Sequence, residues 1–125
     1  MPTVSTGVVA SYDRRTDTLE RHPVWEKITT FSLISGDTTG TAVVVVNGLL
    51  QKIIVTLTDM ANAEGTTDVS LTDNGDNTIW SVTDLAESDT YIYSVSEPLA
   101  HEVNVVLAFD DPQATATVAV TLRGV

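Results

Sequence analysis

The sequence lacks cysteine and has few basic residues. Because its 125 residues include no Cys, disulfides, thiolate zinc sites and a cysteine nucleophile are excluded. Six Lys and Arg stand against 17 Asp and Glu, and the formal net charge is −11. A chain this acidic repels nucleic-acid phosphates and anionic membrane surfaces, so we expect neither as a partner.

Long apolar runs and helical patterns are also missing. No apolar run approaches the ~18 residues that a membrane-spanning helix requires, and residues 1–10 do not have the pattern of a signal peptide. From Thr29 onward, short runs rich in Val, Ile and Thr alternate with clusters of Gly, Asn, Asp and Pro. This pattern predicts an all-β fold, an antiparallel β-sandwich of jelly-roll or Ig-like type with about eight strands.

The charge is unevenly distributed along the chain. Four bases and four acids cancel within residues 1–27, so the net charge lies in the rest of the sequence. The N-terminal segment is polar and has no clear period, whereas the remainder reads as strands. We therefore expect an N-terminal extended arm or loop over residues 1–28 and a β-sandwich domain over residues 29–125.

Three pairs of neighbouring runs are predicted to form β-hairpins. Val43–Val46 and Leu49–Leu57 flank Asn47-Gly48, a dipeptide that suits a two-residue type I′ turn. "HEVNVVLAF" (101–109) and "ATATVAVTL" (114–122) flank "DDPQ", and "DVSLTD" and "TIWSVTD" flank the turn described next. A further strand is expected over residues 90–96, ended by Pro98.

The stretch "LTDNGDNTIW" (71–80) is the densest cluster of potential oxygen ligands. Asp73 and Asp76 are weak candidates for a cation site, because the glycine and acid spacing does not match that of an EF-hand loop. Asx residues and Gly are also the residues that a tight turn prefers. We therefore predict a turn between two strands, with no metal and no cofactor.

Neither the nucleophile elbow G-x-S-x-G nor a Gly-rich phosphate loop occurs, so no catalytic residue is assigned and we expect a protein that is not an enzyme. Aromatic residues make up 6% of the chain. Trp25, Trp80, Tyr91 and Tyr93 would form a sugar-stacking platform only if two or three were exposed and coplanar; otherwise they belong to the core or to subunit contacts.

The order of the motifs carries a resemblance over residues 29–125. "SGDTTGTA" is followed by "VVNGLLQKIIV", "DMANAEGTTD", "VSLTDNGDNTIW" and "DLAESD", and the chain closes with "LAHEVNVVLAFDDPQATATVAVTLR". This ordered set resembles small virion structural proteins of tailed bacteriophages, of the capsid decoration or cement type. The resemblance implies a non-enzymatic β-sandwich on the capsid exterior that binds the major capsid protein, bridges neighbouring subunits and acts as a homo-oligomer.

Two elements are expected to make the partner contacts. The first is the N-terminal segment, through Tyr12, Arg14, Arg15, Arg21 and Trp25. The second is the exposed face of the expected Val43–Leu57 hairpin, with Val44 and Val46 as its candidates, because its arms are apolar on nearly every residue. Two alternatives remain open: a receptor- or glycan-binding head of a tail or fibre protein, and a secreted calcium-dependent β-sandwich module.

Overall fold

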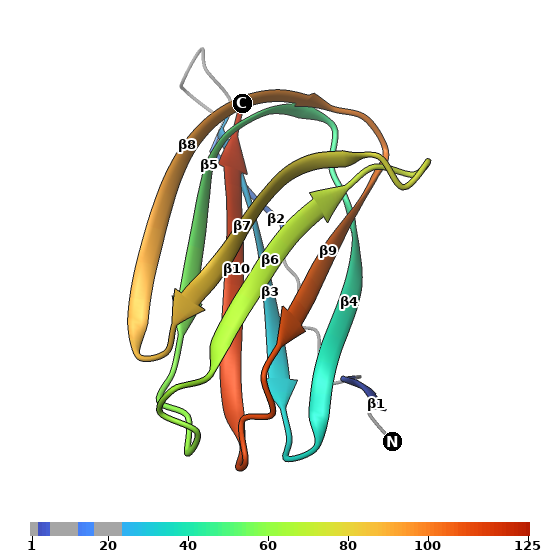
Figure 1. Ribbon diagram of the computed structural model, residues 1–125. Coiled ribbons are helices and arrows are strands. Elements are labelled where there is room, and N and C mark those ends of the chain that lie inside the picture. Colours follow the sequence, from blue (N-terminus) through green and yellow to red (C-terminus); the bar gives the residue numbers. More distant parts are fainter. Residues whose placement is uncertain (1–2, 6–12, 17–23) are drawn as a thin grey trace.

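Two five-stranded sheets face one another in the computed structural model (Figure 1). The structure describes residues 3–5, 13–16 and 24–125, with side chains from Val24 onward. Sheet A has the order β1-β4-β9-β6-β7, with bounds β1 Thr3–Ser5, β4 Asp37–Val45, β9 Glu102–Phe109, β6 Thr66–Thr72 and β7 Thr78–Ala86. Sheet B has the order β2-β3-β10-β5-β8, with bounds β2 Asp13–Thr16, β3 Val24–Leu33, β10 Ala116–Gly124, β5 Gly48–Leu57 and β8 Asp89–Leu99.

The expected all-β sandwich is confirmed. Eight strands, β3 to β10, span residues 24–124 and pair antiparallel, and β1 adds to β4 in parallel. No element of the described ranges is a helix long and apolar enough to cross a membrane.

Alternating side chains build the core between the sheets. In β9 and β10 every second residue is buried, because successive side chains of a strand point to opposite faces of its sheet. The largest fully buried side chains come from both sheets: Phe31, Leu33, Leu50, Ile53, Leu71, Leu107 and Leu122, with Val55, Val69, Val103, Val105 and Val118. The outward residues of the same strands form two broad outer faces.

The expected hairpin around Asn47-Gly48 is wrong. β4 belongs to sheet A and β5 to sheet B, so the chain crosses from one sheet to the other at this dipeptide. The Asn47 side-chain oxygen accepts a hydrogen bond from the His101 backbone N–H at 2.9 Å, and the Leu49 N–H donates to the Val125 carbonyl at 2.8 Å. Gly48 has a φ of 144°, which favours glycine. Asn47 and Gly48 therefore form a connection between the two sheets and not a type I′ turn.

The expected pairing of the last two strands is also wrong. β9 lies between β4 and β6 in sheet A, whereas β10 lies between β3 and β5 in sheet B. The Asp111 carboxylate holds the connection: one oxygen accepts from the Gln113 N–H at 2.8 Å and from the Gly36 N–H at 2.9 Å. Since Gly36 follows β3, the same carboxylate ties this crossover to the β3–β4 turn.

Three further boundaries differ from expectation. β3 begins at Val24, so a division after residue 28 falls inside a continuous strand. β2 pairs with β3, so the N-terminal segment contributes to the sheet. β8 continues through Pro98, because it is the edge strand of sheet B and an edge residue needs no ladder donor on its free side.

Candidate functional site

The turn between β6 and β7, residues 73–77, is organised by one carboxylate. The predicted hairpin is confirmed, since β6 pairs with β7. One Asp73 oxygen accepts from the Gly75 and Asn77 backbone N–H groups, each at 2.9 Å. The Asn77 side-chain amide donates to both Asp73 oxygens, at 3.2 and 3.1 Å. The carboxylate therefore serves as the internal cap of the turn.

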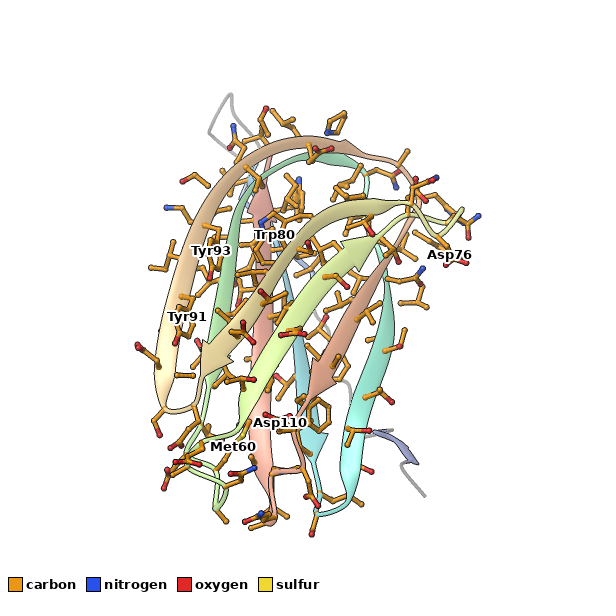
Figure 2. The ribbon with its side chains drawn as sticks, in the orientation of Figure 1. Met60, Asp76, Trp80, Tyr91, Tyr93 and Asp110 are labelled. Carbon is orange, nitrogen blue, oxygen red and sulfur yellow. The ribbon has the colours of Figure 1, made fainter. Side chains whose placement is uncertain are left out.

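Asp76 stands at the tip of the same turn and points away from the sandwich (Figure 2). Its φ of 62° is the left-handed conformation that Asp tolerates in turns. Within residues 24–125, no group of three or more His, Asp or Glu side chains is arranged to hold a metal ion. The geometry of Asp73 and Asp76 is accounted for by the turn.

The hydrogen bonds of the turn predict a pH effect on stability. The Asn77 N–H, and then its side-chain amide, lower the pKa of Asp73 from its usual value, because both donate to the charged form. A lowered pKa in the folded state gives stability that is present above the unfolded pKa and is lost as the pH falls through the folded pKa.

We therefore expect Asp73→Ala to lower the melting temperature by a few degrees at pH 7, with a smaller loss as the pH falls below about 4. Thermal unfolding followed by circular dichroism at several pH values measures this. Asp76→Asn is the matched control, because Asn tolerates the left-handed conformation of this residue and the Asp76 carboxylate accepts none of these bonds. Equal losses for Asp73→Ala at every pH would contradict the assignment.

Three aromatic residues, Trp80, Tyr91 and Tyr93, form a half-buried cluster between the edge strands β7 and β8 (Figure 2). The rings of Trp80 and Tyr93 have centroids 5.1 Å apart and are tilted by 58°. The Tyr91 hydroxyl accepts from the Ala86 N–H at 3.1 Å and donates to the Ala86 carbonyl at 3.3 Å. Burial, and then the neighbouring Tyr91, raise the pKa of Tyr93. Tilted, half-buried rings that pack on the core do not form the coplanar platform that sugar stacking requires.

A shallow acidic depression of about 320 Å³ lies beside the end of β9. Its carboxylates are Asp68, Asp84 and Asp110. Asp110 accepts from the Thr66 N–H at 3.0 Å, and Asp68 accepts from the Asp84 N–H at 2.9 Å. Two of the three carboxylates thus hold backbone segments in place.

Trp25 is not a surface contact residue. Only 3% of it is exposed, and its indole N–H donates to the Val125 carbonyl at 3.2 Å. A Cβ added at Gly48 or Gly124 would lie 2.8 Å from an atom of its side chain. The alternation of β3 turns this residue inward, so Trp25 closes one end of the sandwich.

The other expected contact residues fall into two groups. Val44 and Val46 are 2% and 3% exposed, so their assignment to an exposed face is wrong. Their neighbours Val43 and Val45 are 57% and 51% exposed and lie on the outside of sheet A. The choice of Val44 and Val46 has the wrong parity, because the sequence does not say which side of an all-apolar run meets the core.

The N-terminal candidates are only partly placed. Tyr12 and Arg21 lie outside the described residues. Arg14 and Arg15 belong to β2, where the backbone positions pair with Glu26 and Trp25 of β3. The structure therefore brings these two arginines to the outermost strand of sheet B.

Sequence reasoning missed the separation of charge between the sheets. The strands of sheet A carry four acids and no Lys or Arg. All Lys and Arg of the described residues lie in sheet B: Arg14, Arg15, Lys27, Lys52 and Arg123. Finding this from the sequence requires the correct assignment of strands to sheets, which the two wrong hairpins prevented.

No protein-family model matches the sequence, and no curated protein matches it. Among solved structures, the chain is similar to the pre-peptidase C-terminal domain of a collagenase from Bacillus anthracis, with 14% identity and a TM-score of 0.52 over 76% of this chain and 86% of that one. It is also similar to the CBM36-1 domain of a multidomain xylanase from the hindgut metagenome of Trinervitermes trinervoides, with 12% identity and a TM-score of 0.44 over 96% and 91% of the two chains. An endospore appendage protein of Bacillus gives 9% identity and a TM-score of 0.43 over 98% and 95%. At these identities the first likeness shows the β-sandwich fold and nothing finer.

Proposed function

We propose that the protein is a virion structural protein of a tailed bacteriophage, a capsid decoration protein that binds the major capsid protein on the outside of the shell and bridges neighbouring subunits. The ordered motifs over residues 29–125 support the proposal through their resemblance to that family. The observation that carries it is the place of the N-terminal segment, which supplies an outermost strand to each sheet.

The two N-terminal strands leave edges on which another chain can add. β1 pairs with β4 over three residues and β2 pairs with β3 over four, and among the described residues each has one neighbour in its sheet. The unpaired edge of such a strand offers N–H and C=O groups to an extended segment of a partner. The opposite edge of sheet B is less suitable, since Pro98 of β8 interrupts its row of donors.

Charge gives the same edge a preference among partners. Arg14 and Arg15 are consecutive bases in a protein whose net charge is −11. An acidic segment of a coat subunit is attracted to these two bases and repelled by the net negative charge of the protein as a whole. A shell repeats the contact many times, and any linkage between neighbouring copies turns modest single contacts into tight attachment.

Binding to undecorated, pre-assembled shells tests the proposal. We expect the full chain to add at a fixed stoichiometry, measured by sedimentation of the shells and quantification of bound protein. Deleting residues 2–23, which removes β1 and β2 and leaves β3 from Val24 onward, is expected to abolish binding. The charge-reversal pair Arg14→Glu and Arg15→Glu is expected to weaken it at least tenfold, because repulsion replaces attraction.

The matched control is the pair Arg14→Lys and Arg15→Lys, which keeps both charges and is expected to retain most binding. Thermal unfolding of every variant establishes that the sandwich is intact. Full occupancy by the deletion variant, or equal binding by the Glu and Lys pairs, would exclude the N-terminal strands as the coat-binding element.

A further inference from the structure

The sandwich has two outer faces of different character. The outer face of sheet A consists of the outward residues of β4, β9 and β6, and the outer face of sheet B of those of β3, β10, β5 and β8. The charged residues of the sheet A strands are four acids, while the sheet B strands carry every base of the described residues together with the acids Asp13, Glu26, Asp89 and Glu97. Each face also exposes large apolar side chains.

The outer face of sheet A has an apolar area next to one acid. Val43 and Val45, both more than half exposed, lie opposite Asn104 and Glu102 of β9. Val106 is in the next outward row of β9, opposite Thr41. Glu102 is two residues along the strand from Asn104, which places it roughly 7 Å from the Val43 row.

The outer face of sheet B has the same plan with the opposite charge. A row of mostly apolar side chains runs across four strands through Ile28, Thr121, Ile54 and Ile92. Ile92 is 61% exposed.

The adjacent row of sheet B carries the charges. It runs through Glu26, Arg123, Lys52 and Ser94. The Arg123 Nε atom donates to Glu26 at 2.6 Å, so Lys52 and the remaining guanidinium donors give the row its basic character. Lys52 is two residues from Ile54, the same spacing that separates Glu102 from the Val43 row.

We propose that copies of this chain associate head to tail, with the outer face of sheet A of one copy packed on the outer face of sheet B of the next. With the strands aligned, placing Val43 on Ile54 puts Val45 on the apolar stem of Lys52 and brings Glu102, which lies opposite Val45, beside the Lys52 ammonium. Sheets that pack face to face lie about 10 Å apart with their strands nearly aligned, which allows both contacts at once. The occupant of each face is therefore a second copy, selected by charge complementarity.

A contact between two identical faces is less favourable than a contact between a sheet A face and a sheet B face. Two sheet A faces would bring acids against acids with no base between them, and like charges across an interface are repulsive. Pairing two sheet B faces would leave Val43 and Val45 in water. A head-to-tail contact joins unlike faces, so it generates a ring if the rotation closes and a linear chain if it does not. This inference goes beyond the shell-binding proposal and is tested without shells.

The test is a complementation experiment with two single variants of the full chain. Val43→Lys damages only the sheet A face and places a base over Ile54, two residues from Lys52, whereas Ile92→Glu damages only the sheet B face. Sedimentation equilibrium at about 0.15 M salt measures the mass of each variant, of the parent chain and of an equimolar mixture. The parent mass is expected to rise with concentration, and each variant alone is expected to associate at least tenfold more weakly.

The equimolar mixture tests whether the contact joins a sheet A face to a sheet B face. The intact sheet B face of Val43→Lys can still bind the intact sheet A face of Ile92→Glu, so the mixture is expected to form a 1:1 dimer and to grow no further. Ile34→Glu and Ile34→Lys are the controls, since Ile34 is 54% exposed but lies in the turn after β3, outside both faces. A parent chain that stays monomeric, undiminished self-association of either variant, or a mixture that stays monomeric would each overturn the proposal.

Discussion

Replacing Gly124 with Ala is expected to destabilise the protein by about 3 kcal/mol or more, the upper range for overpacking a filled core. A Cβ at this position would overlap the Leu49 carbonyl oxygen and lie 2.8 Å from the Trp25 ring. Gly124 is buried, and its backbone stands opposite Trp25 on one side and Leu50 on the other. Relief would require the backbones of β5 and β10 to move apart, because the obstructing atom belongs to the main chain.

Chemical denaturation of Gly124→Ala and of the parent chain gives the change in free energy of unfolding. Gly36→Ala is the control that separates crowding from backbone conformation. Gly36 has a φ of 93°, but a Cβ there would meet nothing within 4 Å, so only the backbone cost of about 1–2 kcal/mol remains. If Gly124→Ala were no more destabilising than Gly36→Ala, the close contact of Trp25, Leu49 and Gly124 would not hold in solution.

The fold class could be predicted from the sequence, whereas the strand pairing could not. Alternation in 101–109 and 114–122 identifies two half-buried strands, because the period of two comes from backbone geometry within each strand. Pairing depends on contacts with segments far away in the chain. The Asn47 side chain accepts a hydrogen bond from the His101 N–H, and the Asp111 side chain accepts one from the Gly36 N–H. These distant partners turn two hairpin-like connections into crossovers between the sheets.

The turn at residues 73–77 was predicted correctly because its cause is local. Asp73, Gly75 and Asn77 satisfy one another within five residues, and no distant contact is needed to define the bend. The charges of the outer faces, in contrast, depend on contacts between residues far apart in the sequence. Glu26 and Arg123 meet at 2.6 Å although 97 residues separate them. The charge asymmetry between the sheets therefore becomes visible only after the strands are assigned.

Val44→Asp and Val43→Asp, in adjacent residues of β4, are expected to have very different effects. Val44 is 2% exposed and faces the opposite sheet, so a carboxylate there is buried without a partner. An unpaired buried charge costs about 3–5 kcal/mol, and the loss of valine packing adds to it. Val43 is 57% exposed, and a surface change of this kind shifts the free energy of unfolding by about 0.5 kcal/mol or less.

Denaturant titrations of both variants at a concentration where the parent chain is monomeric measure this difference without a contribution from self-association. Asp can occupy position 43 because the side chain enters water, and it cannot occupy position 44 without protonation or local unfolding. The two variants therefore show which alternate residues of β4 face the core. Equal stability of the two variants would place the whole β4 segment outside the core. A larger loss of stability for Val43→Asp than for Val44→Asp would mean that Val43 faces the core and Val44 faces the outer surface.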